Sequence, residues 1–175
     1  MKIRKAAILG LTAVLLSFPA AAQDAKPDGV PKVGERIGDW VFQCQAVSAT
    51  RNICGLVQTI IDNKTKRQVV GIAIRYAGKE TDRRLGMFVT VPLGIFLGSG
   101  IGGKIDDGKQ FTFNLQTCNQ RGCQGAVEIK PEMLAEMKKG NRLIVGFKAR
   151  ADSNTIAVPV SLKGFTQGLK TIDAN

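Results

Sequence analysis

Four cysteines are the residues of this chain best suited to covalent chemistry, because they form two close pairs in sequence. Nine residues separate Cys44 from Cys54, and four separate Cys118 from Cys123. Four cysteines allow three pairings, and closeness in sequence favours Cys44–Cys54 and Cys118–Cys123. A zinc site would show shorter C-x-x-C-like pairs, and a redox catalyst would show C-x-x-C at a helix start. We therefore expect two structural disulfides.

Acid–base chemistry has few candidates, because the chain contains no histidine. This excludes Ser-His-Asp and Cys-His catalysis and metal sites with histidine ligands. Asp106 and Asp107 are adjacent and are typical of a solvated turn, while Glu132 and Glu136 lie one helical turn apart and should face solvent. Neither pair has recognisable supporting residues. The sequence therefore predicts no enzyme, no catalytic or metal-binding residue and no cofactor, although a cryptic carboxylate enzyme stays open as a lesser alternative.

The glycine-rich segment Gly98–Lys104 matches two nucleotide-binding patterns, G-x-G-x-x-G and G-x-x-x-x-G-K. The phosphate-loop pattern also needs Ser or Thr after the lysine, and a helix that points its N-terminus at phosphate. Ile105 occupies the first position, and the turn residues Asp106–Gly108 follow it. We expect a flexible β-connection here rather than a nucleotide site.

The longer uncharged segment Leu85–Gly103 approaches the length of a membrane span, but it contains six glycines and a proline. That composition favours a buried strand, a loop and a second short strand. Within the loop, Leu93–Leu97 (LGIFL) is interpreted as core. An exposed apolar surface that contacts a partner or a membrane is the alternative.

The N-terminal residues have the layout of a secretory signal peptide. Basic residues within Met1–Lys5 precede the apolar stretch Ala6–Phe18, and Pro19–Gln23 supplies a small-x-small cleavage site after Ala22. The apolar stretch of 13 residues is well short of the roughly 20 needed to span a bilayer. We expect residues 1–22 to be removed, which leaves an exported mature chain without a transmembrane span.

The net charge is +11, and it falls to +8 when the three basic residues of the signal peptide are removed. A charge of this sign suits an anionic envelope or host-surface component, such as lipid headgroups, lipopolysaccharide or an acidic glycan. Plain solubility and another protein as the partner remain open, and the sequence does not indicate the oligomeric state. Nucleic acid is not expected, because one Trp and one Tyr provide few stacking platforms.

The cysteines and charges must be positioned by a mostly β domain. Residues 23–35 should form a flexible leader and residues 36–175 a single domain, in which short apolar runs broken by turn residues are typical of an all-β sandwich or barrel. Alternation places Trp40, Phe42 and Cys44 on one core face. In chain order, the expected strands begin at Trp40 and continue with Ile53–Ile61, Gln68–Tyr76, Leu85–Val91, Phe111–Leu115, Leu143–Ala149 and Ile156–Leu162.

Local signals refine this arrangement. One short α-helix is expected over Lys130–Gly140, which ends with Gly140 as a left-handed cap, and Gly164–Ile172 favours a short closing helix. Pro159 predicts an edge strand or a bulge. Cys118 is in phase with polar residues and Cys123 with apolar ones, so we expect a break in register near their disulfide, at an exposed hairpin tip outside the core.

An ordered set of segments resembles the invasion-associated locus B family of exported bacterial proteins. In chain order, these segments are Gly38–Cys44 (GDWVFQC), Cys54, Val89–Gly94 (VTVPLG), Cys118-x4-Cys123, the Met133–Gly140 helix and Pro159–Phe165 (PVSLKGF). The resemblance implies an immunoglobulin-like β-sandwich in the periplasm, outer envelope or cell surface, with a role in host-cell invasion for some members. It supplies no catalytic motif. The leading hypothesis is a non-enzymatic partner-binding protein that assists host-cell entry in pathogens, and the alternative is a periplasmic accessory protein for envelope integrity.

Overall fold

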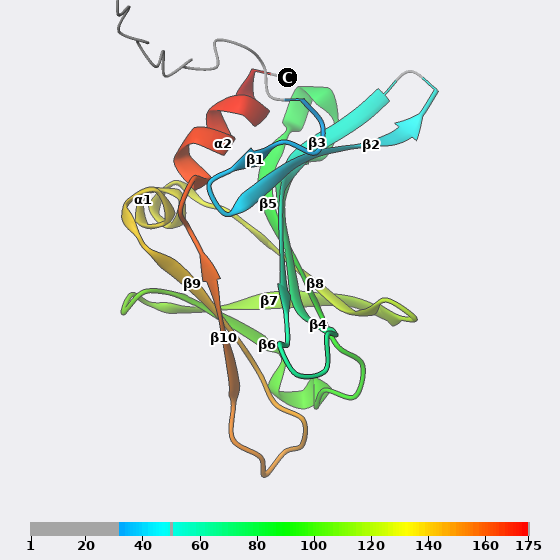
Figure 1. Ribbon diagram of the computed structural model, residues 1–175, viewed down its shortest axis with the longest axis vertical. Coiled ribbons are helices and arrows are strands. Elements are labelled where there is room, and N and C mark those ends of the chain that lie inside the picture. The colour runs from blue at the N-terminus through cyan, green and yellow to red at the C-terminus, as the bar shows by residue number, and fades with distance from the viewer. Residues whose placement is uncertain (1–31, 50, 175) are drawn as a thin grey trace, which may run out of the picture.

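A computed structural model describes residues 32–49 and 51–174, which form ten strands and two α-helices (Figure 1). The strands are β1 (Arg36–Ile37), β2 (Trp40–Ser48), β3 (Arg51–Ile61), β4 (Gln68–Ala77), β5 (Arg84–Val91), β6 (Ile101–Ile105), β7 (Gln110–Asn119), β8 (Gly122–Glu128), β9 (Arg142–Phe147) and β10 (Ile156–Ser161). The helices are α1 (Pro131–Lys139) and α2 (Phe165–Asp173), with short 3-10 helices at Glu80–Asp82 and Leu97–Ser99.

The expected signal peptide, residues 1–22, lies outside the described residues, as do residues 23–31 of the expected leader. Residues 32–35 of that leader are held against β2. The N–H of Gly34 donates to the carbonyl of Phe42 at 2.7 Å, and the N–H of Phe42 donates to the carbonyl of Glu35 at 2.9 Å. Backbone hydrogen bonds of the domain therefore begin before the first strand.

All ten strands belong to one antiparallel sheet, with the order β1-β2-β3-β4-β5-β8-β7-β6-β9-β10. β7 joins its two halves, because residues 110–113 pair with β6 and residues 114–119 pair with β8. Figure 1 shows β7 crossing the molecule between β2–β5 and β8 on one side and β9 and β10 on the other. The mostly β expectation is confirmed. Because the ladder is continuous through β7, the separate sheets of an immunoglobulin-like sandwich are not shown.

The core lies between the two halves of the bent sheet and is closed by α2. Both halves contribute to one buried cluster, in which Trp40 and Phe42 are fully buried as the alternation predicted. The N-terminal residue of α2, Phe165, places its ring 6.1 Å from that of Trp40. The second helical turn brings Gly168 against Leu56, where a Cβ atom would lie 2.5 Å from the leucine side chain. This packing fixes α2 over β1–β3.

Both expected helices are confirmed, but the expected cap of α1 is wrong. Gly140 has φ −75° and ψ 163°, an extended conformation open to any residue. Its lack of a side chain serves close packing, because a Cβ atom there would lie 2.9 Å from Ile105 and 3.0 Å from an Asp106 carboxylate oxygen. Within the part of the chain that the structure describes, neither nine-residue helix is long enough to cross a membrane.

Two predictions about strand irregularity are confirmed. Pro159 lies in β10, the last strand of the sheet order, where its missing N–H faces no partner strand. The β7–β8 ladder shifts register between Leu115 and Thr117. Gln116 is the additional residue, and it restores the pairing of Cys118 with Cys123 directly across the hairpin.

Candidate functional site

The two disulfides join neighbouring strands and take the pairing that sequence proximity favours. Cys44 bonds to Cys54 between β2 and β3, and Cys118 bonds to Cys123 at the tip of the β7–β8 hairpin. The first pair is half-buried against the core. In the second, Cys118 is exposed but Cys123 is 3% exposed and belongs to the core, so the expectation that this disulfide lies outside the core is only half right. It fastens an exposed hairpin tip to the interior.

The four carboxylates considered for catalysis are engaged or dispersed. Asp106 accepts hydrogen bonds from the backbone N–H groups of Asn141 and Arg142 at 2.9 and 3.2 Å, and so holds the start of β9. Asp107 is exposed, with Lys104 3.6 Å away. Glu132 and Glu136 are exposed on α1. Over residues 32–49 and 51–174, no three carboxylates or cysteines are grouped in a way that could hold a metal ion.

Two other carboxylates do meet, at a place that the sequence did not single out. Asp82 and Glu128 both bind Arg84, at 3.3 and 3.5 Å. The hydrogen bond to Asp82, followed by the charges of Asp82 and Glu128, raises the pKa of the Arg84 guanidinium. This cluster is an exposed ion-pair network in which one guanidinium faces two carboxylates.

The glycine-rich segment forms a 3-10 helix followed by strand β6, as the expected β-connection required. No helix follows Lys104, so the backbone has no helix N-terminus to direct at a phosphate group. The expected order of a strand, a loop and a second short strand is also confirmed, as β5, residues 92–100 and β6.

The interpretation of Leu93–Leu97 as core is wrong for most of its residues. Leu93, Phe96 and Leu97 are 56%, 39% and 54% exposed. Only Ile95 packs partly against the core. The chain leaves the sheet after Val91, and the loop is held by a hydrogen bond from the Phe96 N–H to the Lys148 carbonyl at 2.7 Å. This bond leaves the flanking apolar side chains pointing away from the interior.

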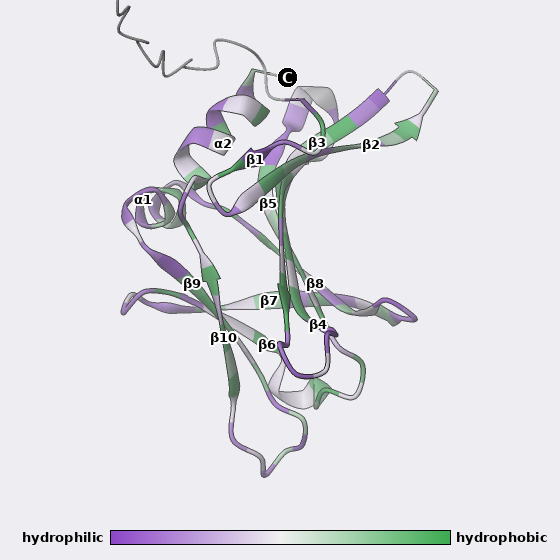
Figure 2. Ribbon diagram, viewed as in Figure 1, coloured by the Kyte–Doolittle hydropathy of each residue, from purple (hydrophilic) through white to green (hydrophobic). Residues whose placement is uncertain are grey.

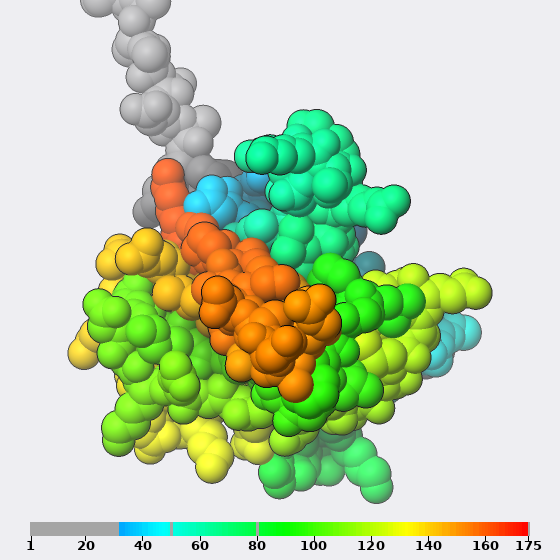
Figure 3. Space-filling model, turned by 90° about the horizontal axis from the view of Figure 1, so that it is seen from below, coloured from blue at the N-terminus to red at the C-terminus, as the bar shows by residue number. Residues whose placement is uncertain are grey.

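These residues lie at one end of the molecule, which carries two further exposed apolar side chains on or beside neighbouring loops. We call it the apolar end and define it by five exposed side chains: Ile61, Leu93, Phe96, Leu97 and Ile156. They lie on or beside three loops, residues 62–67, 92–100 and 148–155, which lie in the lower part of Figure 1 and are seen from below in Figure 3. Figure 2 shows hydrophobic colour at the tip of the middle loop.

Basic residues surround the apolar end. In chain order, they are Lys64, Lys66, Arg67, Lys148 and Arg150. Asp62 and Asp152 are the acidic residues of the same loops. Asp62 accepts hydrogen bonds from the Thr65 N–H at 2.6 Å and the Lys64 N–H at 3.1 Å, and Asp152 lies 3.3 Å from Arg150. The end therefore combines exposed apolar side chains with an excess of positive charge.

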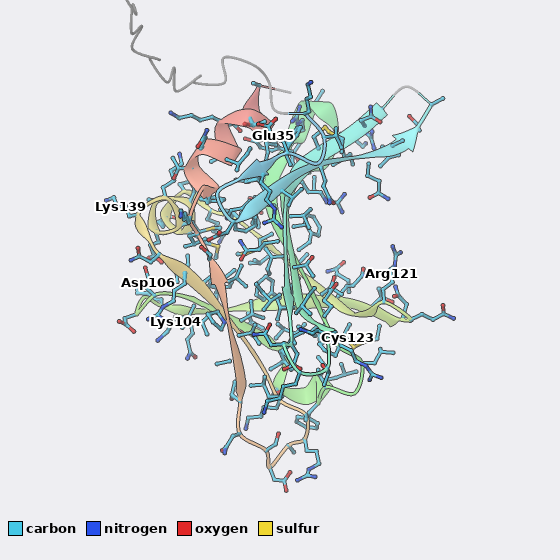
Figure 4. All side chains as sticks on the ribbon, in the orientation of Figure 1. Glu35, Lys104, Asp106, Arg121, Cys123 and Lys139 are labelled. Carbon is cyan, nitrogen blue, oxygen red and sulfur yellow. A yellow bond between two sulfur atoms is a disulfide. The ribbon has the colours of Figure 1, made fainter. Side chains whose placement is uncertain are left out.

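A second candidate surface lies on the outer face of the sheet, across β2, β3, β4, β5, β8 and β7. We call it the outer trough, a hollow of about 560 Å³. Its polar lining consists of Gln43, Gln45, Arg75, Thr90, Gln116, Arg121 and Gln124. Figure 4 shows Arg121 on the projecting β7–β8 hairpin, on the opposite side of the molecule from Lys104, Asp106 and Lys139. The catalytic candidates of the sequence therefore do not line this trough.

The sheet register holds Arg75 in the middle of the outer trough. Arg75 of β4 pairs with Gly55 of β3 on one side and with Gly86 of β5 on the other. The Arg75 guanidinium lies over the Phe88 ring, 4.4 Å from its centre. A side chain at Gly55 would collide with Arg75 at 2.8 Å, and one at Gly86 would meet the Phe88 ring at 3.0 Å. The two glycines thus leave the space that this stacked pair occupies.

Comparison with known proteins gives a consistent family relationship. A model of the Invasion associated locus B (IalB) protein family matches residues 40–173. Invasion protein B homologues of Brucella abortus strain 2308 and of Brucella abortus biovar 1 strain 9-941 are each 32% identical to the chain, over 99% of its length and 98% of theirs. The crystal structure of invasion associated protein B from Bartonella henselae superimposes with a TM-score of 0.68 at 22% identity, covering 80% of this chain and 94% of that one.

Proposed function

The chain belongs to the invasion associated locus B family, and from this premise we propose that it is an exported, non-enzymatic protein of the periplasm, outer envelope or cell surface. It binds a partner and assists host-cell entry where the bacterium is a pathogen. The names of the Brucella relatives, invasion protein B homologues, support the entry role. The two disulfides support a location outside the cytoplasm, because disulfides persist in oxidising compartments.

The observation that carries the proposal is the apolar end. Most large apolar side chains of a soluble protein find cover, and contiguous exposed ones mark contact surfaces. Fully burying a Leu or Phe side chain contributes about 1.5–3 kcal/mol. Leu93, Phe96 and Leu97 are only partly buried, so much of this free energy is not gained in the free protein. Their loop is already held by the hydrogen bond between Phe96 and Lys148. A partner that covers them gains this energy with little loss of loop entropy.

An entry assay with a complemented deletion strain tests the proposal. The test variant is Leu93→Ser/Leu97→Ser, and the matched control is Val47→Ser, which removes an apolar side chain that is 43% exposed on β2. We expect the control to restore entry as well as the wild-type protein does, and the double variant to restore about a tenth of it or less. Equal entry by both variants would contradict a role for the apolar end.

The second candidate function is a periplasmic accessory protein for envelope integrity, with no host role. Protease treatment of intact cells separates the two, because a surface protein is cleaved and a periplasmic one is protected. A deletion strain that enters host cells normally but becomes sensitive to detergent would remove the entry role and favour the accessory one.

A further inference from the structure

The outer trough has positive charge that no carboxylate of its lining balances. Arg75 and Arg121 line it, and no Asp or Glu does. Among the described residues, the ion pairs involve Arg84, Lys104 and Arg150 instead. The acidic residue in the same cross-strand row as Arg75 is Glu128, two strands away, and it is already bound to Arg84. An anionic ligand would therefore meet two guanidinium groups without displacing an internal partner.

Arg75 is held ready for such a ligand. It is half-buried, flanked by glycines on both neighbouring strands, and stacked on Phe88. Stacking on an aromatic face keeps the planar guanidinium flat and leaves its edge free to form paired hydrogen bonds with a carboxylate or sulfate group. Because the side chain is already ordered in the free protein, little rotamer entropy is lost on binding.

Apart from the two arginines, the polar part of the lining is neutral and suited to hydroxyl groups, and apolar side chains such as Ile53, Val57 and Phe88 make up the remainder. Four glutamines, Gln43, Gln45, Gln116 and Gln124, each present both donors and acceptors, and Thr90 adds a hydroxyl. The trough crosses six neighbouring strands, which corresponds to about 24 Å at the usual strand spacing. Five of the seven exposed large apolar side chains of the described residues belong to the apolar end instead. Charge, hydrogen-bonding groups and length together match an acidic polysaccharide better than a lipid.

We propose that the outer trough binds an acidic glycan, with Arg75 receiving a carboxylate or sulfate group and the glutamines receiving the sugar hydroxyls. Arg121 contacts a further acidic group from the hairpin tip that the Cys118–Cys123 disulfide holds. This site is separate from the apolar end and adds a second binding activity to the proposed function. If the glycan proposal fails, the proposed function of the apolar end is unaffected.

Titration of the disulfide-bonded mature chain with four probes tests the proposal. The probes are a heparin oligosaccharide with sulfate and carboxylate groups, an oligogalacturonate with carboxylate groups alone, a neutral dextran oligosaccharide, and phosphatidylglycerol vesicles. We expect the two acidic glycans to bind and the dextran not to bind. Raising the salt from about 0.1 M to about 1 M should weaken binding strongly, because the screening length falls from about 10 Å to about 3 Å.

Paired variants separate the site from general positive charge. Arg75→Gln should weaken acidic-glycan binding by about tenfold or more, the loss expected for a charge-assisted hydrogen bond. Arg75→Lys keeps the charge but lacks the planar guanidinium with its paired N–H donors, and it should show a smaller loss of affinity. The matched control, Arg84→Gln, removes an equal charge outside the trough and should bind within about twofold of the wild-type protein. Circular dichroism on each variant verifies that it is folded.

Several outcomes would overturn the proposal. Equal losses of affinity in Arg75→Gln and Arg84→Gln would show that binding depends on net charge alone. If the protein binds the vesicles but neither acidic glycan, the positive surface would be assigned to lipid. No binding of either acidic glycan, or equal binding of dextran, would also refute it. Nuclear magnetic resonance shifts on binding should appear at Gly55, Gly86 and Gln124 and not at residues 93–97; the reverse pattern would place the ligand on the apolar end.

Discussion

The outer trough and the apolar end differ in how the fold fixes their side chains. Arg75 and Phe88 lie on neighbouring strands inside a hydrogen-bonded ladder, where each pairing sets which side chains share a row. Leu93 and Leu97 lie on a connection after β5, and the hydrogen bond between Phe96 and Lys148 ties that connection to the start of another loop. The polar surface is therefore part of the framework of the domain, whereas the apolar surface is attached to it.

This difference predicts different responses to mutation and to solution conditions. A change in the floor of the trough should disturb the sheet itself, because glycines at Gly55 and Gly86 admit the large side chains beside them. A change in the exposed residues of the apolar end should alter binding and leave the free energy of unfolding nearly unchanged.

The largest effect is expected from Gly55→Ala. The new methyl group would lie 2.4 Å from the Ile74 carbonyl oxygen and 2.8 Å from the Cβ of Arg75, so two paired strands must move apart. We expect the free energy of unfolding to fall by about 2–3 kcal/mol, as for an overpacked interior site. Urea denaturation measures it.

Leu97→Ala provides the matching measurement at the apolar end. It removes a side chain that is 54% exposed, and the free energy of unfolding should change by no more than about 0.5 kcal/mol. Equal losses in the two variants would show that the loop is as much a part of the framework as the sheet is, and the distinction between the two surfaces would fail.

A smaller effect is expected when the Cys118–Cys123 disulfide is removed by Cys118→Ala/Cys123→Ala. The chain-entropy model gives about 2 kcal/mol for so short a loop. Amide hydrogen exchange at residues 119–122 should accelerate, because the hairpin tip with Arg121 loses its link to the core. Acidic-glycan binding by the outer trough should weaken in parallel.

Removal of the other disulfide is the control for this prediction. Cys44→Ala/Cys54→Ala should lower stability by a similar amount, about 2–3 kcal/mol, and leave exchange at residues 119–122 unchanged. Faster exchange at the β7–β8 tip in both variants would mean that the disulfides act on the whole sheet. It would refute the idea that the second disulfide specifically steadies the β7–β8 hairpin tip.

The faces of the strands could be predicted from the sequence because alternation is local. Val70, Ile72 and Ile74 share the buried face of β4, which places Arg75 on the outer face. The register break near Cys118 also followed from phase alone. These properties depend only on residues close together in the chain.

The partners of each strand could not be predicted in the same way. β5 pairs with β8, and β7 changes partner along its length, so Gln116, Arg121 and Gln124 reach the same trough as Arg75 only through long-range pairing. Within Leu93–Leu97, four of five residues are apolar and no period distinguishes the one that packs inward. Its orientation is set by the bond to Lys148, which the local sequence does not specify.

The smallest effect is expected from acid titration of the turn beside the apolar end. The Asp62 carboxylate accepts the Thr65 N–H at 2.6 Å, the Thr65 hydroxyl at 2.8 Å and the Lys64 N–H at 3.1 Å. These hydrogen bonds, with that of the Thr65 backbone the largest, lower the pKa of Asp62 below its ordinary value of 3.8. The folded state therefore favours the ionised form. The contribution of Asp62 to stability is complete above pH 3.8 and is lost as the pH falls through the lowered pKa.

Nuclear magnetic resonance can measure this titration residue by residue and compare the two surfaces directly. The Asp62 carboxyl and the Thr65 amide should titrate together with a midpoint below 3.8, and Asp62→Ala should abolish the change at Thr65. The amides of Gly55 and Thr90 should stay constant over the same range, because no carboxylate lines the outer trough. A midpoint at Asp62 equal to or above 3.8 would mean that the turn is not held by its carboxylate. A matching titration at Gly55 would show that the loop and the sheet are coupled. The apolar end and the outer trough would then not differ in how the fold holds them.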